Sequence, residues 1–275
     1  MMDTRTFLLL GLTLFSALAR AEQQPLWEAG AGVGAVDFPK YRGSEERRVW
    51  VLPVPYFTYN GPFLKVTRQS ARGLLYRTDR VEMDVSFGGS VPSSTTAARA
   101  GMPNLDATFE VGPQLQYHVY YDAKKETNVD LRLPVRPAIA TDFTHFRNIG
   151  WVFEPVVNLD LKNLRGSRWN MGLAAGPVYA DRGYNSYFYS VDPQYATASR
   201  PAYAAPGGYS GYQLTFALSK RFPGYWTGGF VKWDDLGRAV FADSPLVTSR
   251  HNFTFGWAIT WVIGRSPQTV EVSND

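Results

Sequence analysis

The chain has 275 residues, of which 45% are hydrophobic and 15% aromatic, with no cysteine and a formal net charge of +4. Without cysteine, an exported chain must be held together by burial or by a continuous hydrogen-bonded sheet rather than by disulfides. So small a charge, spread along the chain, gives no support for nucleic-acid binding.

Residues 1–21 are typical of a secretory signal peptide. Arg5 supplies the positive start, residues 7–18 ("FLLLGLTLFSAL") form a short apolar run, and Ala19-Arg20-Ala21 matches an A-x-A cleavage site. The run is too short for a transmembrane helix, and no other apolar run of about 20 residues follows. We therefore expect the mature chain to begin near Glu22 without a helical membrane span.

From residue 26 onward the sequence alternates apolar and polar residues. In "LDATFEVGPQLQYHVYY" (105–121), Phe109 and Val111 belong to an apolar face, whereas Thr108 and Glu110 belong to a polar one. A period of two predicts a β-strand with two different faces. The same reasoning predicts an all-β fold with strands near 26–36, 47–59, 62–77, 80–89, 105–121, 127–140, 149–162, 167–180, 209–221, 225–234 and 250–263.

These strands favour an antiparallel transmembrane β-barrel over a soluble periplasmic sandwich, which is the alternative. They are longer than the usual five or six residues, aromatic residues gather at their ends, and short turns contrast with long loops. We predict about 12 strands (10–14) over residues 22–264, with short periplasmic turns, longer extracellular loops and a flexible tail at 265–275. The eleven segments need one more strand, either at 184–190 or by a break of 62–77 near Gln69 and Ser70.

Charged residues at mid-strand are the candidate site residues. They would face the barrel lumen, where mixed signs favour a salt-bridged plug over an ion-selective ring, with a narrow pore as the alternative. These lumen-facing candidates are Glu110, Arg132, Arg136, Glu154, Asp160 and Arg168.

Catalytic chemistry has little support in this sequence. The three histidines, His118, His145 and His251, are far apart and lack the spacing of a metal site. No G-x-S-x-G or phosphate-loop motif occurs. We therefore expect a protein that is not an enzyme and has no catalytic, cofactor or metal site.

Several motifs resemble the MipA/OmpV family of outer-membrane proteins. The first is a G-x-G pair (Gly32, Gly34), followed by Tyr41, Gly43 and Ser44, and then by an Arg (Arg47 or Arg48) before "LPVPY" with Pro53 and Pro55. Further matches are "RGLLY" (72–76), "GMPNLDATFEVG" (101–112), the Tyr-rich loop within 183–211 and "DSPLV" (243–247). Their order and spacing cover essentially the whole mature chain.

The resemblance implies an outer-membrane β-barrel located in the cell outer membrane. The family's best-known member is regarded as a scaffold that joins a lytic murein transglycosylase to a bifunctional penicillin-binding protein, whereas others are known as surface antigens or adhesins. No catalytic or binding residue of the family can be carried over. One departure is that family members usually end on an aromatic-ending strand, whereas here "GRSPQTVEVSND" follows Ile263.

Overall fold

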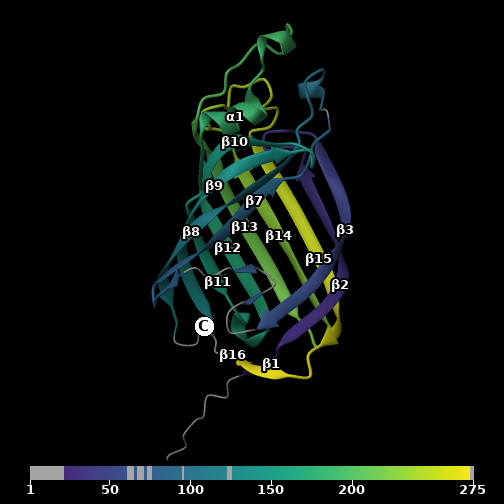
Figure 1. Cartoon of the computed structure of the whole chain (residues 1–275), viewed down its shortest axis with the longest axis vertical. Helices are drawn as coiled ribbons and strands as arrows, with labels where there is room; N and C mark the ends of the chain where they lie inside the picture. Colours follow the sequence, from purple (N-terminus) through teal and green to yellow (C-terminus); the bar gives the residue numbers. More distant parts are fainter. Residues whose placement is uncertain are drawn as a thin grey trace, which may run out of the picture.

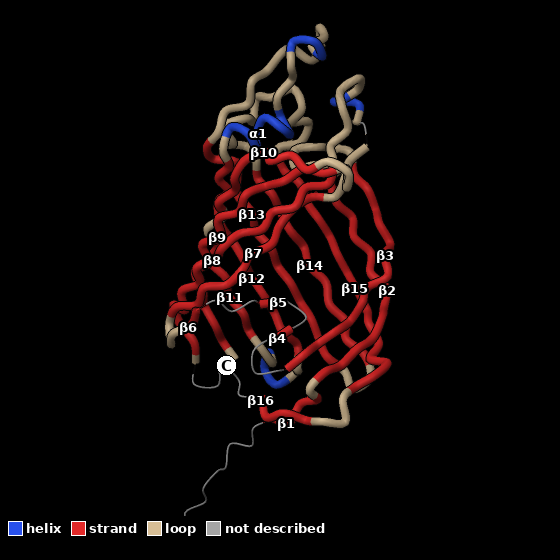
Figure 2. Tube along the Cα trace, viewed as in Figure 1, coloured by secondary structure: helices blue, strands red, loops and turns tan. Residues whose placement is uncertain are grey.

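The dominant feature is one antiparallel sheet of 14 strand segments that curls into a barrel (Figures 1 and 2). The computed structural model describes residues 22–60, 65–66, 71–72, 76–94, 96–122 and 126–272, so the expected signal peptide lies outside the described residues. The segments are β2 (Trp27–Pro39), β3 (Arg47–Asn60), β4 (Lys65–Val66), β5 (Ala71–Arg72), β6 (Tyr76–Arg77), β7 (Val81–Ser90), β8 (Ala107–Tyr121), β9 (Thr127–Thr141), β10 (Phe146–Phe153), β11 (Val156–Leu161), β12 (Trp169–Ala180), β13 (Gly208–Arg221), β14 (Tyr225–Asp235) and β15 (His251–Arg265). Within the described residues, no helix is both long and apolar enough to cross a membrane.

The strands follow one another around the sheet as they do along the chain. The order is β5-β4-β3-β2-β15-β14-β13-β12-β10-β9-β8-β7-β6, and the pairing of β2 with β15 joins the two ends of the sequence. Segments β10 and β11 both pair with β9 and β12, so they are two halves of one strand. The residues that link β5 to β6, 73–75, lie outside the described part of the chain.

The two faces of the sheet confirm the barrel and argue against a soluble sandwich. On β8, Phe109 and Val111 are 51% and 43% exposed, whereas Glu110 between them is 5% exposed. On β15, Phe253 and Phe255 are exposed, whereas Asn252 is buried. A soluble sandwich would bury its apolar face, so this sheet turns its apolar side outward, as a barrel in lipid does.

The additional strand considered at 184–190 does not exist. Those residues belong almost entirely to helix α1 (Arg182–Tyr189), which follows β12. The segment 62–77 is instead divided into β4, β5 and β6, and β4 pairs with β5 as a hairpin. Gln69 and Ser70, where a break was expected, lie outside the described residues.

Five prolines of β8, β9, β12 and the link between β10 and β11 lie in one part of the barrel wall. The ladder between β8 and β9 stops at Glu110 and resumes at Gln114, and Pro155 lies opposite Pro177 in the register of β11 and β12. Because proline has no N–H to donate, grouping the prolines confines the lost ladder bonds to one strip. These prolines are Pro113, Pro134, Pro137, Pro155 and Pro177.

A short ribbon and short turns mark the periplasmic end. Strands β1 (Glu22–Pro25) and β16 (Thr269–Val272) form a separate two-stranded antiparallel sheet, here called the periplasmic ribbon (Figure 1). The Leu26 N–H donates to the carbonyl of Gln268, which ties the ribbon's base. The segment 265–275, expected to be a flexible tail, therefore contains a paired strand.

Candidate functional site

Five loops meet over the extracellular mouth of the barrel and form a structure that we call the cap. The cap consists of residues 40–46, 91–94, 96–106, 142–145, 181–207 and 236–250, and it includes α1 and the short 3-10 helices η1 (Ala97–Arg99) and η3 (Pro193–Tyr195). Figure 2 shows it at the opposite end of the barrel from the periplasmic ribbon. A third 3-10 helix, η2 (Leu164–Gly166), lies in a periplasmic turn.

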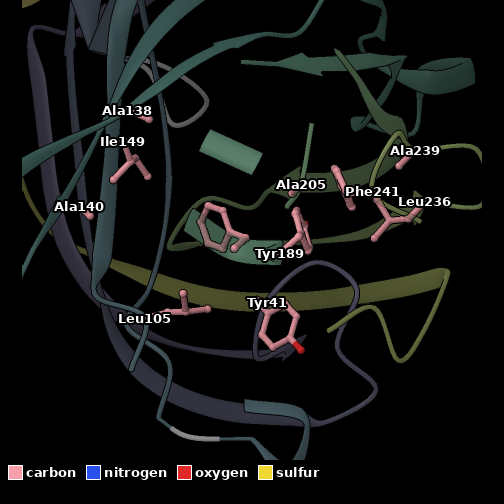
Figure 3. Packing of buried hydrophobic residues seen from close by; sticks show 11 residues of the cluster. Tyr41, Leu105, Ala138, Ala140, Ile149, Tyr189, Ala205, Leu236, Ala239 and Phe241 are labelled. Carbon is pink, nitrogen blue, oxygen red and sulfur yellow. The ribbon is translucent and has the colours of Figure 1, made fainter. Parts of the chain in front are cut away.

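The cap has its own hydrophobic core. Figure 3 shows small side chains from the strand tops, such as Ala138 and Ala140, beside larger ones from the loops. Phe241 is fully buried, and its ring stacks on Tyr189 with centroids 3.7 Å apart and planes 10° apart. The remaining members of the core are Tyr41, Leu105, Ile149, Phe188, Ala205, Leu236 and Ala239. The best-packed apolar region therefore lies at the mouth, because the wall turns its apolar side chains outward.

Helix α1 is positioned by its N-cap and by one buried amide. Asp181 caps the helix by accepting the Tyr184 N–H, as acidic N-cap residues do. Asn185 is fully buried, and it donates to the Pro206 carbonyl while accepting from the Ser210 hydroxyl. These bonds hold α1 against the returning loop and the start of β13.

Two of the motifs used for the family resemblance meet in the cap. The Tyr41 hydroxyl donates to the carbonyl of Leu246, which belongs to "DSPLV", at 2.6 Å. Gly43 donates to the Asn252 side chain and accepts the N–H groups of Thr248 and Ser249. Its φ of +96° is a conformation that favours glycine. The motifs are thus two sides of one contact between loops far apart in sequence.

A buried ion pair joins the cap to the lumen wall. The Arg42 Nε donates to Asp234 Oδ1 at 2.8 Å, and its Nη2 donates to the Ser210 carbonyl. Burial alone would lower the pKa of Arg42, but Asp234 and nearby tyrosines outweigh it and raise that pKa. Lys232 Nζ lies 3.7 Å from Asp234. The sequence separation of 192 positions between Arg42 and Asp234 makes this pair a long-range connection across the mouth.

A second connection uses three of the lumen-facing candidates, Glu110, Arg136 and Glu154, which we call the lumen brace. Arg136 is 4% exposed; its Nε donates to Glu110 at 3.0 Å, and its Nη2 pairs with Glu154. Tyr184 from α1 donates its hydroxyl to the other Glu110 oxygen at 3.1 Å. Burial raises the pKa of Tyr184 well above its ordinary value, so the phenol remains a donor. The lumen brace lies behind the proline strip and reaches the cap.

Arg132 and Asp160 form a separate group nearer the periplasm. Arg132 Nη2 lies 3.6 Å from both Asp130 and Asp160. Asp130 also contacts His118 Nδ1 at 2.7 Å. This group is a network of mixed charges, as the lumen brace is.

Arg168 lies apart from both of these charged groups. It lies in the exposed turn just before β12, with a φ of +62°. The Trp169 position begins the strand, so Arg168 belongs to the periplasmic surface rather than to mid-strand.

Sequence reasoning missed Tyr184, Asp234 and the periplasmic pair Glu28 and Arg221. Glu28 stands on the same strand face as Gly30 and Gly32, so its inward position could have been obtained by counting alternate residues. Arg221 Nη2 donates to both oxygens of Glu28, at 2.8 and 2.9 Å. Tyr184 carried a weaker signal, because its segment was interpreted as a loop or a short strand and its helix was not foreseen.

His145 and His251 each contact a neighbouring residue in this fold. In the exposed loop after β9, Asp142 accepts the N–H groups of Thr144 and His145 and the Thr144 hydroxyl, and these hydrogen bonds lower the pKa of Asp142. His251 stacks on Trp233. In the described part of the chain, no group of three or more His, Asp or Glu side chains is arranged to hold a metal ion. The arrangement is a packed cap that ion pairs and hydrogen bonds connect to the wall.

Comparisons with known proteins agree with the fold. The family model described as "MltA-interacting protein MipA" matches residues 31–263. Outer membrane protein OmpV of Vibrio cholerae serotype O1 (strain ATCC 39315 / El Tor Inaba N16961) and outer membrane protein Omp26La of Vibrio anguillarum are each 32% identical over 90 residues. Each match covers 32% of this chain and 34% of the relative. The matched segment therefore spans about a third of either relative's length.

Solved structures give weaker likenesses. A bacterial polysaccharide outer membrane secretin has a TM-score of 0.46 at 9% identity, covering 86% of this chain and 99% of that chain. The NanC porin has a TM-score of 0.37 at 9% identity, covering 86% of this chain and all of that one. At these scores neither likeness bears on function. The family match over residues 31–263, together with a lipid-facing barrel, shows that this chain belongs to the MipA family and is an outer-membrane protein.

Proposed function

We propose that this protein is a non-enzymatic outer-membrane scaffold that holds murein-remodelling enzymes, a lytic transglycosylase and a penicillin-binding protein, at its periplasmic end. The observation that carries the proposal is the match of residues 31–263 to a family described as MltA-interacting.

The packing of the cap favours a closed barrel over an open pore. Its core fills the extracellular mouth, and two buried charge connections, Arg42 with Asp234 and Tyr184 with Glu110, fasten it to the wall. Opening a path would require breaking both connections, and each leaves a charged side chain at the wall with fewer partners. A barrel closed in this way is suited to being an anchor.

The periplasmic end is small, and this limits the contact that it can make. A standard stable interface buries roughly 800 Å² on each partner, which short turns and a ribbon with four residues in each strand do not readily supply. We therefore expect weak binding, with a partner strand adding to an edge of the periplasmic ribbon.

A capture experiment tests this proposal. The full chain in detergent micelles is immobilised and exposed to a purified lytic transglycosylase. Deleting residues 269–275 removes β16 but keeps Ser266, whose N–H donates to the Trp27 carbonyl. Deleting residues 194–199 in the cap is the matched control. We expect the control to capture the enzyme as the full chain does, and the β16 deletion to capture at least several-fold less. Capture by neither the full chain nor the control would contradict the scaffold.

A surface adhesin is the second candidate, because the outermost loops are held in one arrangement. Arg200 donates to the carbonyls of Ala98 and Ala100, and Arg99 donates to the carbonyl of Phe188. Rigid loops on a barrel are suited to recognition. If the deletion of residues 194–199 abolishes attachment of whole cells to a host surface, this second function is supported; unchanged attachment contradicts it.

A further inference from the structure

Lys220 lies on the outer face of the barrel wall, at the periplasmic end of β13. It is opposite Trp169, the first residue of β12. Phe216, four residues earlier on β13, is 40% exposed on the lipid-facing side, and side chains two and four positions apart on a strand share a face. The next residue, Arg221, points into the lumen and binds Glu28. Lys220 therefore faces outward where the strand ends.

Two aromatic rings position the Lys220 ammonium. Its Nζ lies 5.5 Å from the centroid of the Trp169 ring and 5.1 Å from that of the Phe222 ring. A cation over a ring face at such a distance is attracted by the π-electrons. Phe222 in turn stacks on Tyr225 with centroids 4.4 Å apart, and its N–H donates to the Tyr225 carbonyl. The turn that carries the second ring is thus held in one arrangement.

Among the described residues, Lys220 has no carboxylate partner. Arg47, which also lies on the outer face but at the extracellular end, pairs with Asp37 at 3.0 Å. In the described part of the chain, the buried side-chain nitrogens that lack a hydrogen-bond partner belong to Arg132 and Arg221. The Lys220 ammonium is therefore accessible from outside the barrel, and its charge is not offset by an acidic side chain.

Neighbouring turns add positive charge to the same rim. Arg168 is exposed and directly precedes Trp169. Arg265 is also exposed, and its Nη2 donates to the Pro223 carbonyl at 3.5 Å, in the turn between β13 and β14. Together with Lys220 these residues favour an anionic ligand.

The outer face around Lys220 indicates the medium that it meets. Trp261 is 50% exposed and lies opposite Tyr225, and such aromatic residues at strand ends lie at the headgroup level of a bilayer. Toward the middle of the barrel the same face is apolar, with Phe216 and Val231 opposite each other and 40% and 37% exposed. A phospholipid that covers this apolar band with its chains brings its phosphate to the level of Lys220.

We propose that Lys220, Trp169 and Phe222 form a binding site for the phosphate of an anionic phospholipid in the periplasmic leaflet. The ammonium donates to the phosphate oxygens, and Arg168 adds positive charge beside it. The two rings limit the positions of the lysine side chain, so less freedom is lost when the phosphate binds. This site does not depend on the scaffold function.

Native mass spectrometry tests the inference. The full chain in detergent micelles is titrated with dioleoylphosphatidylglycerol, and the affinity of the first bound lipid is measured. Dioleoylglycerol, which has the same chains and no phosphate, is the comparison ligand and should bind at least fivefold more weakly. Lys220→Met keeps the length of the side chain but removes its charge. It should weaken phosphatidylglycerol binding about fivefold, the effect of one cation near a lipid surface.

Lys162→Met is the matched control. It removes the same charge from an exposed residue in the periplasmic turn before β12, and Lys162 contacts neither ring. This variant should bind phosphatidylglycerol as the unmodified chain does. Heat-modifiable migration on a gel checks that the barrel of each variant has assembled.

Equal affinity for the two lipids, unchanged binding by Lys220→Met, or an equal loss in Lys162→Met would overturn the inference. Glycerol 3-phosphate distinguishes a lipid from a free phosphate. We expect an equimolar amount of it to leave phosphatidylglycerol bound. Displacement of the lipid at that concentration would assign the site to soluble phosphates and would also overturn the inference.

Discussion

The two ends of this barrel differ in how they are built. The extracellular cap has a core of buried aromatic and aliphatic side chains and two buried charge connections to the wall. The periplasmic end has short turns, the periplasmic ribbon and two buried polar atoms without a hydrogen-bond partner, Arg221 Nη1 and Thr260 Oγ1. The described part of the cap buries its polar side-chain atoms with partners, whereas these two atoms of the wall have none.

This difference indicates which end is permanent structure and which is available for binding. A buried polar network whose hydrogen bonds are all made rigidifies the region around it, whereas a partly satisfied one does so less. We therefore place stability at the extracellular end and recognition at the periplasmic end. The predictions below test that division, beginning with the largest effect.

Arg136→Met should have the largest effect, because it leaves Glu110 and Glu154 without their cation. Removing one member of a buried pair costs about 3–5 kcal/mol. Urea unfolding of the barrel in detergent micelles should show this loss. The triple variant Glu110→Gln, Arg136→Met and Glu154→Gln, which removes all three charges, should recover much of it. A triple variant as unstable as Arg136→Met would show that side-chain packing, and not charge, determines how much the lumen brace stabilises the barrel.

Arg42→Met should cost less. Asp234 loses its closest cation but keeps Lys232 at 3.7 Å, so the loss should fall below the 3–5 kcal/mol expected for a charge left alone, at about 2 kcal/mol. The change should loosen the cap and increase protease cleavage within residues 192–204. Unchanged cleavage would mean that the hydrophobic core alone holds the cap. Lys40→Met, at a half-buried surface pair with Glu46, is the control and should change cleavage little.

Asp181→Ala removes the N-cap of α1 and should cost about 1 kcal/mol. The expected result is faster hydrogen exchange in residues 182–189 with no change in the unfolding of the barrel. Asp181→Asn, which can still accept the Tyr184 N–H, should behave as the unmodified chain. Equal exchange in the alanine and asparagine variants would show that tertiary contacts alone fix the helix.

The smallest effect is a pH dependence at Glu46. Hydrogen bonds from Lys40 and from the Ala97 N–H lower the pKa of Glu46 below its ordinary 4.5. A lowered pKa stabilises the folded cap above pH 4.5, and this contribution is lost as the pH falls below 4.5 through the lowered value. Hydrogen exchange of the Ala97 N–H, corrected for its intrinsic rate, should therefore become less protected below pH 4.5. Glu46→Gln should remove this pH dependence. If the variant keeps the dependence, a group other than Glu46 causes it.

Much of the wall could be predicted from sequence because alternation is local. The strand expected at 105–121 is β8, Ala107–Tyr121, and that expected at 225–234 is β14, Tyr225–Asp235. The inward positions of Glu110 and Arg136 follow from the same period of two. Once a strand is identified, its faces require no knowledge of the rest of the fold.

The cap could not be predicted because its contacts are long-range. Tyr41 meets Leu246, 205 residues away, and no local pattern indicates this contact. Helix α1 did have a local signal, with Asp181 as N-cap and Tyr184 and Phe188 four residues apart, but a Tyr-rich segment between strands was interpreted as a loop. The alignment of Pro155 with Pro177 depends on strand register, which the sequence does not state.

Photo-crosslinking from each end tests the central claim most directly. A photoreactive amino acid replaces Gln268, exposed beside β16, or Gln194, exposed in the cap, in living cells. The division of roles predicts adducts with a lytic transglycosylase or a penicillin-binding protein from position 268 and none from position 194. Adducts from position 194, or none from position 268 when the barrel is correctly assembled, would contradict it.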